Sequence, residues 1–151
     1  MKIIVIVVLL FFSFTLGMFF SAKLNIETKK DLRPTIPVPT PHIFNERELW
    51  GLIQEWRLKN NFPVFVESPR LCSIATDRVD DEKFDNHKGF WEKYGNLEYI
   101  GENIGGDYFS EKELLLSWLN SPSHRTNLER NYTHSCLRCE DKYCVQIFGY
   151  F

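Results

Sequence analysis

Gly101-Glu102-Asn103-Ile104, followed along the chain by Ser121-Pro122-Ser123-His124-Arg125, decides the fold of this chain, and His87 lies upstream of both motifs. Together the three segments bring two histidines and one carboxylate within reach of a single cleft. Imidazole and carboxylate are the side chains that hold a divalent cation or move a proton near neutral pH. The motifs therefore predict a site formed by His87, Glu102 and His124.

Ser121-Pro122 predicts the start of a short helix that runs to about Glu129, with His124 in its first turn. The positive end of the helix dipole disfavours the imidazolium, so we expect a neutral ring that can ligate a metal or accept a proton. A capping or hydrogen-bonded histidine is the alternative interpretation. Arg125 is predicted to bind a carbonyl or carboxylate on the neighbouring hairpin.

Glu102 lies between a glycine, which allows close backbone approach, and an asparagine, which offers a local hydrogen bond in a turn. We expect its carboxylate to be held inward, and the alternative is a glutamate that braces a loop through backbone N–H groups. His87 lies in a polar loop and, taken singly, is more typical of an exposed histidine. No nucleophile–base pair stands out, because Ser121 and Ser123 fit helix capping.

The length of 151 residues predicts one small folded domain. Lysine and arginine number 18 against 20 aspartates and glutamates, and the formal net charge is -2. The chain has no long basic run and no base-stacking motif. Nucleic acid is therefore not an expected partner.

Residues 3–20 are almost wholly apolar and carry no charge. As a helix this segment would span roughly 27 Å, which is close to the thickness of a bilayer core. We predict that residues 1–22 form a transmembrane anchor or a cleaved signal peptide, and that the rest of the chain is exported. Basic residues after the segment favour the opposite orientation on the charge rule alone. The proline-rich residues 23–44 are then an extended linker, and residues 45–151 form the folded domain.

Cys72, Cys136, Cys139 and Cys144 form an even set in a small exported domain, so they are disulfide candidates. The sequence does not choose among the pairings: Cys144 can pair with Cys136 or with Cys139 across a hairpin turn. Cys72 lies on an apolar helical face, where a buried free thiol is also compatible with the pattern. A structural zinc site that uses His134 and the last three cysteines is the competing interpretation.

Four helices are predicted, starting at Asn45, Ser68-Pro69, Ser110 and Ser121-Pro122, each of which supplies an N-cap residue. Strands are predicted over residues 99–104, 132–138 and 144–151, the last two as a hairpin. Helices precede strands, which indicates an α+β fold. The residues expected on buried helical faces are Leu49, Leu52, Ile53, Trp56, Leu71, Ile74, Ala75, Val79, Leu114, Leu115 and Trp118.

The two opening motifs, the helix that ends near Trp118 and the terminal Val145-Gln146-Ile147-Phe148-Gly149 occur in the order found in one family. In these motifs the chain resembles the CAP superfamily of cysteine-rich secretory, antigen 5 and pathogenesis-related 1 proteins, in its short bacterial SCP-like branch. The resemblance covers residues 45–151. It implies an α-β-α sandwich that is usually extracellular. The apolar segment adds an N-terminal hydrophobic helix, so we expect a protein that is secreted or membrane-anchored through residues 3–20.

The same resemblance implies a cleft lined by two histidines and two glutamates, of which His87, Glu102 and His124 match three. The second glutamate would fall where this chain has Asn120 and Ser121. The set is therefore a triad, which weakens the case for a fixed metal. The implied function is a binding module for an unknown ligand or protein partner, whose cleft holds a divalent cation such as zinc. A metal-assisted hydrolase acting on peptide or cell-envelope material is the alternative, although fold analogy alone does not make the protein an enzyme.

Overall fold

The computed structural model describes residues 42–80 and 87–150. The chain divides into two units, residues 1–37 and 38–151, and all described residues belong to the second. The predicted membrane segment, most of the proline-rich linker and residues 81–86, which precede His87, lie outside the described residues. Within the described part no helix is long and apolar enough to cross a bilayer.

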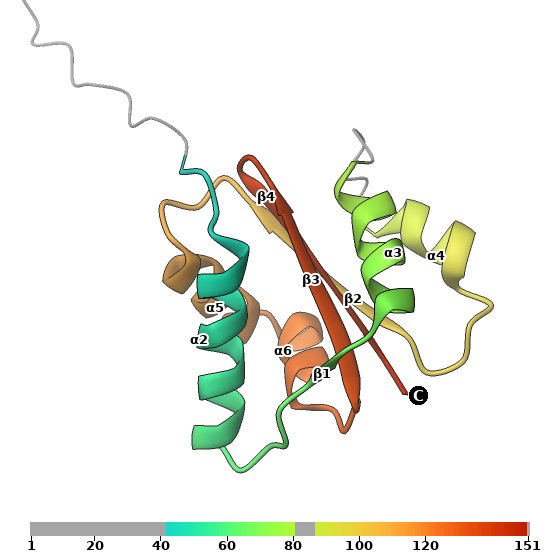
Figure 1. The fold of residues 1–151 in the computed structure, drawn as a ribbon, viewed down its shortest axis with the longest axis horizontal. Helices are drawn as coiled ribbons and strands as arrows, with labels where there is room; N and C mark the ends of the chain where they lie inside the picture. The colour runs from blue at the N-terminus through green and yellow to red at the C-terminus, as the bar shows by residue number, and fades with distance from the viewer. Residues whose placement is uncertain (1–41, 81–86, 151) are drawn as a thin grey trace, which may run out of the picture. The chain divides into compact units, whose positions relative to one another are not determined.

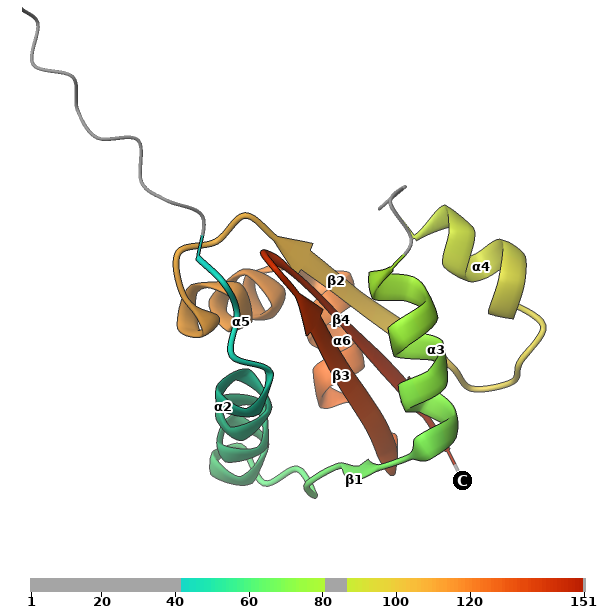
Figure 2. The same ribbon diagram turned by 45° about the horizontal axis from the view of Figure 1, so that its top comes forward.

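In these residues a four-stranded sheet lies between two layers of helices (Figures 1 and 2). The strand order is β1-β3-β4-β2: β1 pairs with β3 in parallel, and β4 pairs antiparallel with both β3 and β2. The elements in chain order are α2 (Glu46–Lys59), β1 (Val66–Glu67), α3 (Pro69–Val79), α4 (Lys88–Tyr94), β2 (Gly101–Gly106), α5 (Glu111–Asn120), α6 (Pro122–Glu129), β3 (His134–Glu140) and β4 (Tyr143–Gly149). The predicted α+β class and its three layers are confirmed.

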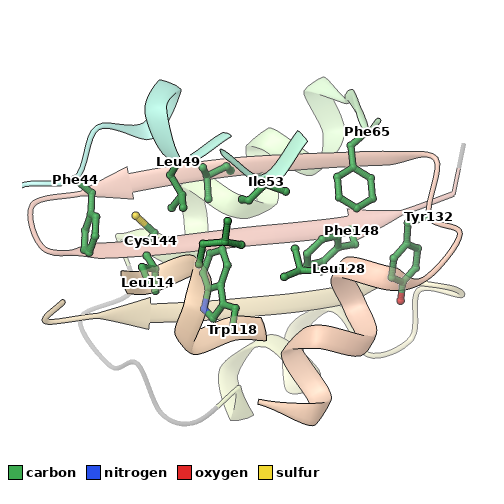
Figure 3. Close-up of a cluster of buried hydrophobic side chains, with 12 residues drawn as sticks. Phe44, Leu49, Ile53, Phe65, Leu114, Trp118, Leu128, Tyr132, Cys144 and Phe148 are labelled. Carbon is green, nitrogen blue, oxygen red and sulfur yellow. The ribbon is translucent and has the colours of Figure 1, made fainter. Parts of the chain in front are cut away.

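Two hydrophobic cores lie on opposite faces of the sheet. One is formed with α2, α5 and α6 and includes Trp118 and Phe148 (Figure 3). The other is formed with α3 and α4 and includes Leu71 and Phe90. Because successive side chains in a strand point to opposite faces, the apolar run of β4 supplies both cores. The sheet is therefore covered on both sides.

Helix starts follow the predicted capping. Asn45 caps α2 by accepting from Glu48 N at 3.2 Å, and Ser110 caps α5 by accepting from Glu113 N at 3.2 Å. Each bond satisfies one of the amide groups that a helix N-terminus leaves without an intrahelical partner. Ser68 makes no side-chain cap bond, and α3 starts with proline at its first position instead.

The disulfides pair Cys72 with Cys136 and Cys139 with Cys144. The free thiol considered for Cys72 is wrong, because α3 packs on β3 and brings the two Cα atoms to 5.0 Å. The Cys136–Cys144 pairing is also wrong, because these two side chains point to opposite faces of the sheet. The zinc site that needed these sulfurs as thiolates is excluded by the same bonds.

Three further expectations need correction. Glu102 lies in strand β2, in agreement with the strand predicted over residues 99–104, and not in the turn from which its inward position was argued, because Gly101 to Gly106 pair continuously with β4. The segment after His87 forms the helix α4, which has no strong cap or long apolar stripe to predict it. Arg125 does not reach the hairpin: its Nε donates to Glu129 at 2.7 Å, one turn along its own helix.

Candidate functional site

The three predicted site residues come from three separate elements. His87 caps α4, Glu102 lies in the edge strand β2, and His124 lies in the first turn of α6. His87 has a φ of 68°, in the left-handed region that histidine adopts more readily than most residues. Helices from the two faces of the sheet thus bring both imidazoles to the β2 edge.

The side chains form a chain of contacts. Glu102 Oε2 lies 2.7 Å from His87 Nδ1, and His87 Nε2 lies 3.2 Å from His124 Nε2. Glu102 is fully buried, whereas His87 is 28% exposed, so the buried carboxylate lies behind a ring that faces solvent. The order is carboxylate, first imidazole, second imidazole.

This order assigns the protons. An ionised carboxylate can only accept hydrogen bonds. His87 Nδ1 therefore carries the proton, and its N–H donates a hydrogen bond to Glu102. In the neutral ring, His87 Nε2 then presents a lone pair toward His124 Nε2. A proton on His124 Nε2 bridges the two rings, and a cation can take the place of that proton.

Arg78 is the residue that the sequence did not single out. Its Nε donates to Glu102 Oε1 at 2.7 Å, and both side chains are almost fully buried. A buried carboxylate without a partner is strongly unfavourable, so the guanidinium compensates the charge of Glu102. Arg78 lies on α3 one position before the predicted apolar Val79, and no spacing rule indicated an inward arginine there.

Two asparagines hold α6 against β2. Asn103 Nδ2 donates to His124 O at 3.1 Å, and Asn127 Nδ2 donates to Glu102 O at 3.0 Å. Asn127 also donates to the Asn103 side-chain oxygen at 3.0 Å. Through these two side chains, the bonds link the backbone of β2 at Glu102 to the backbone of α6 at His124. The position of His124 relative to Glu102 is thereby held.

Arg57 supports the other end of α6. It is fully buried, and its Nη1 donates to Leu128 O and, at 3.4 Å, to Arg130 O. Its guanidinium carbon lies 3.6 Å from the centre of the Phe65 ring. Burial lowers the pKa of Arg57 to about 10, which leaves it charged at neutral pH. The carbonyls at the end of α6 therefore have a cationic donor.

Burial lowers the pKa of His124, and the neighbouring His87 lowers it further, while Glu102 acts in the opposite direction. The neutral form of His124 is therefore favoured near neutral pH. The neutral ring was predicted from the helix dipole, whereas desolvation is its leading cause here.

The site opens into a cleft of about 350 Å³. Ser123 lines it, but Asn120 and Ser121, which stand where the resemblance puts a second glutamate, do not. The residues that matter for its chemistry are His87, Trp91, Glu102, His124, Arg130 and Tyr132. Trp91, Arg130 and Tyr132 were missed, because their place in the cleft depends on α4 and on the tertiary position of the segment after α6.

The three expected metal ligands do not converge on one point. Among residues 42–80 and 87–150, the group whose ligand atoms all lie within 4.8 Å is Glu67, Cys72 and Cys136, and its two sulfurs are joined in a disulfide. The two imidazoles fit a metal better than the triad does. Two tetrahedral ligands at 2.0–2.1 Å from zinc lie roughly 3.3 Å apart, close to the spacing of the two Nε2 atoms.

The protein is an α-β-α sandwich with a cleft of histidine and glutamate side chains at the edge of its sheet. Its family is shown by sequence comparison. Residues 50–148 match the profile of the cysteine-rich secretory protein family, CAP. The chain belongs to this family, which confirms the resemblance found in the motifs. A search of curated proteins found no match.

Three solved structures share the fold. An extracellular protein containing an SCP domain from Bacillus anthracis str. Ames is 24% identical, with a TM-score of 0.58, and the match covers 70% of this chain and 40% of that one. A cysteine-rich secretory protein from Staphylococcus aureus subsp. aureus Mu50 is 20% identical, with a TM-score of 0.58 over 70% of this chain and 38% of that one. An outer surface protein from Borrelia burgdorferi is 17% identical, with a TM-score of 0.54 over 74% of this chain and 98% of that one.

The match therefore spans less than half the length of the first two proteins. These similar proteins are described as extracellular, secretory or outer-surface proteins. The two disulfides of this chain indicate an oxidising compartment as well. An extracytoplasmic location is what these disulfides indicate for the CAP domain.

Proposed function

We propose that this CAP domain is a binding module for a ligand or protein partner, and that its cleft holds a divalent cation such as zinc between His87 and His124. The observation that carries the proposal is the 3.2 Å separation of the two Nε2 atoms. The two rings belong to different elements: the His87 ring is bonded to Glu102 on its far side, and the backbone carbonyl of His124 accepts from Asn103. Such preorganisation reduces the entropy lost when a ligand is bound.

In this proposal Glu102 is not a ligand but the partner that orients the first imidazole. A histidine that binds a metal through one nitrogen donates its other N–H to a carboxylate or carbonyl, and this fixes the ring and raises its basicity. Glu102 has this position behind His87. Arg78 compensates the remaining charge, so the donor set is two neutral nitrogens.

A bound cation supplies an electrophilic point that attracts an anionic or carbonyl oxygen of a ligand. The residues of this chain position the two imidazoles. Glu102 keeps the proton on His87 Nδ1, and the Asn103 side chain holds the backbone of His124 in place. We further propose that residues 3–20 anchor the domain to a membrane or direct its export. The proline-rich linker then holds it away from the bilayer surface.

Zinc titration of the full chain by calorimetry tests the metal part. We expect one zinc per chain and loss of binding in His124→Ala. His134→Ala is the matched control, because His134 lies on β3 and bonds to Thr133 outside the cleft. Absence of zinc binding, or equal loss in the control variant, contradicts the proposal.

A metal-assisted hydrolase is the second candidate. The observation in its favour is the pairing of a buried carboxylate with a partly exposed imidazole, an arrangement that orients a general base. It predicts hydrolysis of peptide or cell-envelope material that is lost together in His87→Ala and Glu102→Gln. Activity that survives both substitutions eliminates this candidate.

A further inference from the structure

A second cavity adjoins the cleft on the side of the α4–β2 connection. It has a volume of about 300 Å³ and is lined by α3, by the residues before β2 and by the end of β4. Ile100 lines both cavities, and Tyr150 of the second cavity contacts Tyr132 of the first with ring centres 5.2 Å apart. We call the two cavities together the aromatic groove, defined by Trp91, Ile100, Tyr99, Tyr132 and Tyr150.

Two aromatic rings of the groove, Trp91 and Tyr99, are exposed and belong to neither core, whereas Tyr132 is a core residue. Trp91 in the first cavity is 54% exposed, and Tyr99 in the second is 68% exposed. Tyr99 also has a φ of 56°, a left-handed conformation that is rare for a bulky side chain and that clusters at functional sites. Its ring contacts the edge of Tyr150 at 5.7 Å. The chain thus keeps an exposed aromatic side chain in each of the two cavities.

The backbone around the groove is not available for pairing with a peptide. The outward carbonyls of the edge strand β2 already accept side-chain bonds: Glu102 O from Asn127 and Ile104 O from Trp118, at 3.0 and 2.9 Å. Strand addition needs these main-chain groups free. A ligand of this groove is therefore recognised by rings and polar side chains, and not by main-chain hydrogen bonds.

The charges in the groove favour an acidic ligand. Arg78 compensates Glu102 in the first cavity, where Arg130 is exposed and donates to Tyr132 Oη at 3.2 Å. Within residues 42–80 and 87–150 no carboxylate forms an ion pair with Arg130. The second cavity carries one charge of each sign, Arg70 and Glu98. The net positive charge lies at the end next to the two imidazoles.

We propose that the aromatic groove binds an acidic oligosaccharide, with sugar rings on Trp91 and Tyr99 and a sugar carboxylate facing Arg130. Sugars present apolar C–H faces to aromatic rings and hydroxyl groups to polar side chains, which matches this lining. Each cavity has the size of a small-ligand site, so the pair fits a ligand of several units. Single-stranded nucleic acid also stacks on aromatic rings, but it needs a positively charged channel that this groove lacks.

The proposal deepens the proposed function, because it names the ligand class of the same cleft. It is tested by NMR titration of the full chain with two tetrasaccharides. One alternates N-acetylglucosamine with N-acetylmuramic acid, and the other contains N-acetylglucosamine alone, so the lactyl carboxylate is the main difference between them. We expect binding of the acidic sugar at least about fivefold tighter than binding of the neutral one.

Three variants locate the binding. Trp91→Ala and Tyr99→Asn are each expected to weaken binding of the acidic sugar about fivefold, and asparagine also tolerates the left-handed backbone of residue 99. Arg130→Gln keeps a donor for Tyr132 and is expected to abolish the preference for the acidic sugar. Phe109→Ala is the matched control, since Phe109 is 61% exposed and does not line either cavity.

Several outcomes overturn the proposal: no binding of either sugar, equal binding of both, binding unchanged in Trp91→Ala and Tyr99→Asn, or equally tight binding of an acidic pentapeptide. The titrations are run with zinc and with EDTA. Sugar binding in a protein that takes up no zinc overturns the cation proposal and leaves the groove intact. Zinc binding without sugar binding overturns the sugar proposal and leaves the cation proposal intact.

Discussion

Replacing Arg78 by methionine is expected to destabilise the domain more than any exposed substitution. Arg78 and Glu102 are 1% and 0% exposed, and their charged atoms lie 2.7 Å apart. Methionine fills part of the volume but leaves the carboxylate of Glu102 buried, and within residues 42–80 and 87–150 its remaining donor is the N–H of His87. Removing one partner of a buried ion pair costs about 3–5 kcal/mol. That is a large part of the roughly 5–15 kcal/mol that stabilises a domain of this size.

The assay is urea unfolding followed by tryptophan fluorescence. Arg125→Met is the matched control, because the Arg125 side chain is 55% exposed and pairs with Glu129 one helical turn away. Such exposed pairs contribute about 0.3–0.5 kcal/mol. The double variant Arg78→Met with Glu102→Gln removes the uncompensated charge and is expected to recover at least about 1 kcal/mol. A single Arg78→Met variant within 1 kcal/mol of the control refutes the reasoning.

Further predictions concern α6, the pH profile and the disulfides. Arg57→Leu leaves the carbonyls at the end of α6 without their donor and is expected to lower the free energy of unfolding by about 2–3 kcal/mol, measured by thermal unfolding; a loss below 1 kcal/mol contradicts this support. Because the folded pKa of His124 is below its ordinary value of 6.5, the unfolded state binds more protons below that pH. The contribution of His124 to the free energy of unfolding is therefore complete above about pH 6.5, and it falls as the pH decreases toward the folded pKa. The decrease is expected to be less steep in His124→Gln. Identical stability profiles of the two proteins from pH 5 to 7 refute this assignment. The two disulfides are expected to differ in their contribution to stability, because the one that joins α3 to β3 spans 64 residues and the one within the hairpin spans 5. On the chain-entropy relation, replacement by serine costs about 4 kcal/mol for the first and about 2 kcal/mol for the second. Denaturant unfolding of both variants measures the difference, and an equal loss contradicts the relation.

The elements that the sequence predicted best have a local cause. Asn45 and Ser110 cap their helices within three residues, and the apolar spacing of Leu49 and Ile53 follows one face of α2. Such signals depend on near neighbours in the chain and need no tertiary structure. The hairpin of β3 and β4 was predicted for the same reason.

Other features depend on contacts between distant segments. The pairing of Cys72 with Cys136 requires α3 to lie on one face of β3, which a linear pattern does not specify. The inward position of Arg57 and Arg78 contradicts the usual exposure of arginine, and it follows only from the buried carbonyls and carboxylate that these residues bind. Helix α4 has seven residues, too few for a convincing periodic pattern.

For the site, the residue types were predictable and their order was not. His87, Glu102 and His124 were identified from short motifs, but all three were expected to be ligands of one cation. The structure arranges them in series, with Glu102 between Arg78 and His87. The difference arises because Arg78 draws the carboxylate into the interior, away from the second imidazole.

The central claim is that Glu102 acts through His87 and that a cation binds the two outer imidazole nitrogens. Nitrogen-15 NMR of the histidine rings, recorded on the full chain with and without zinc, tests it most directly. We predict that zinc shifts Nε2 of both His87 and His124, while Nδ1 of His87 keeps its proton and its bond to Glu102. Zinc bound at Nδ1 of His87, or spectra of both rings that zinc leaves unchanged, would contradict the account.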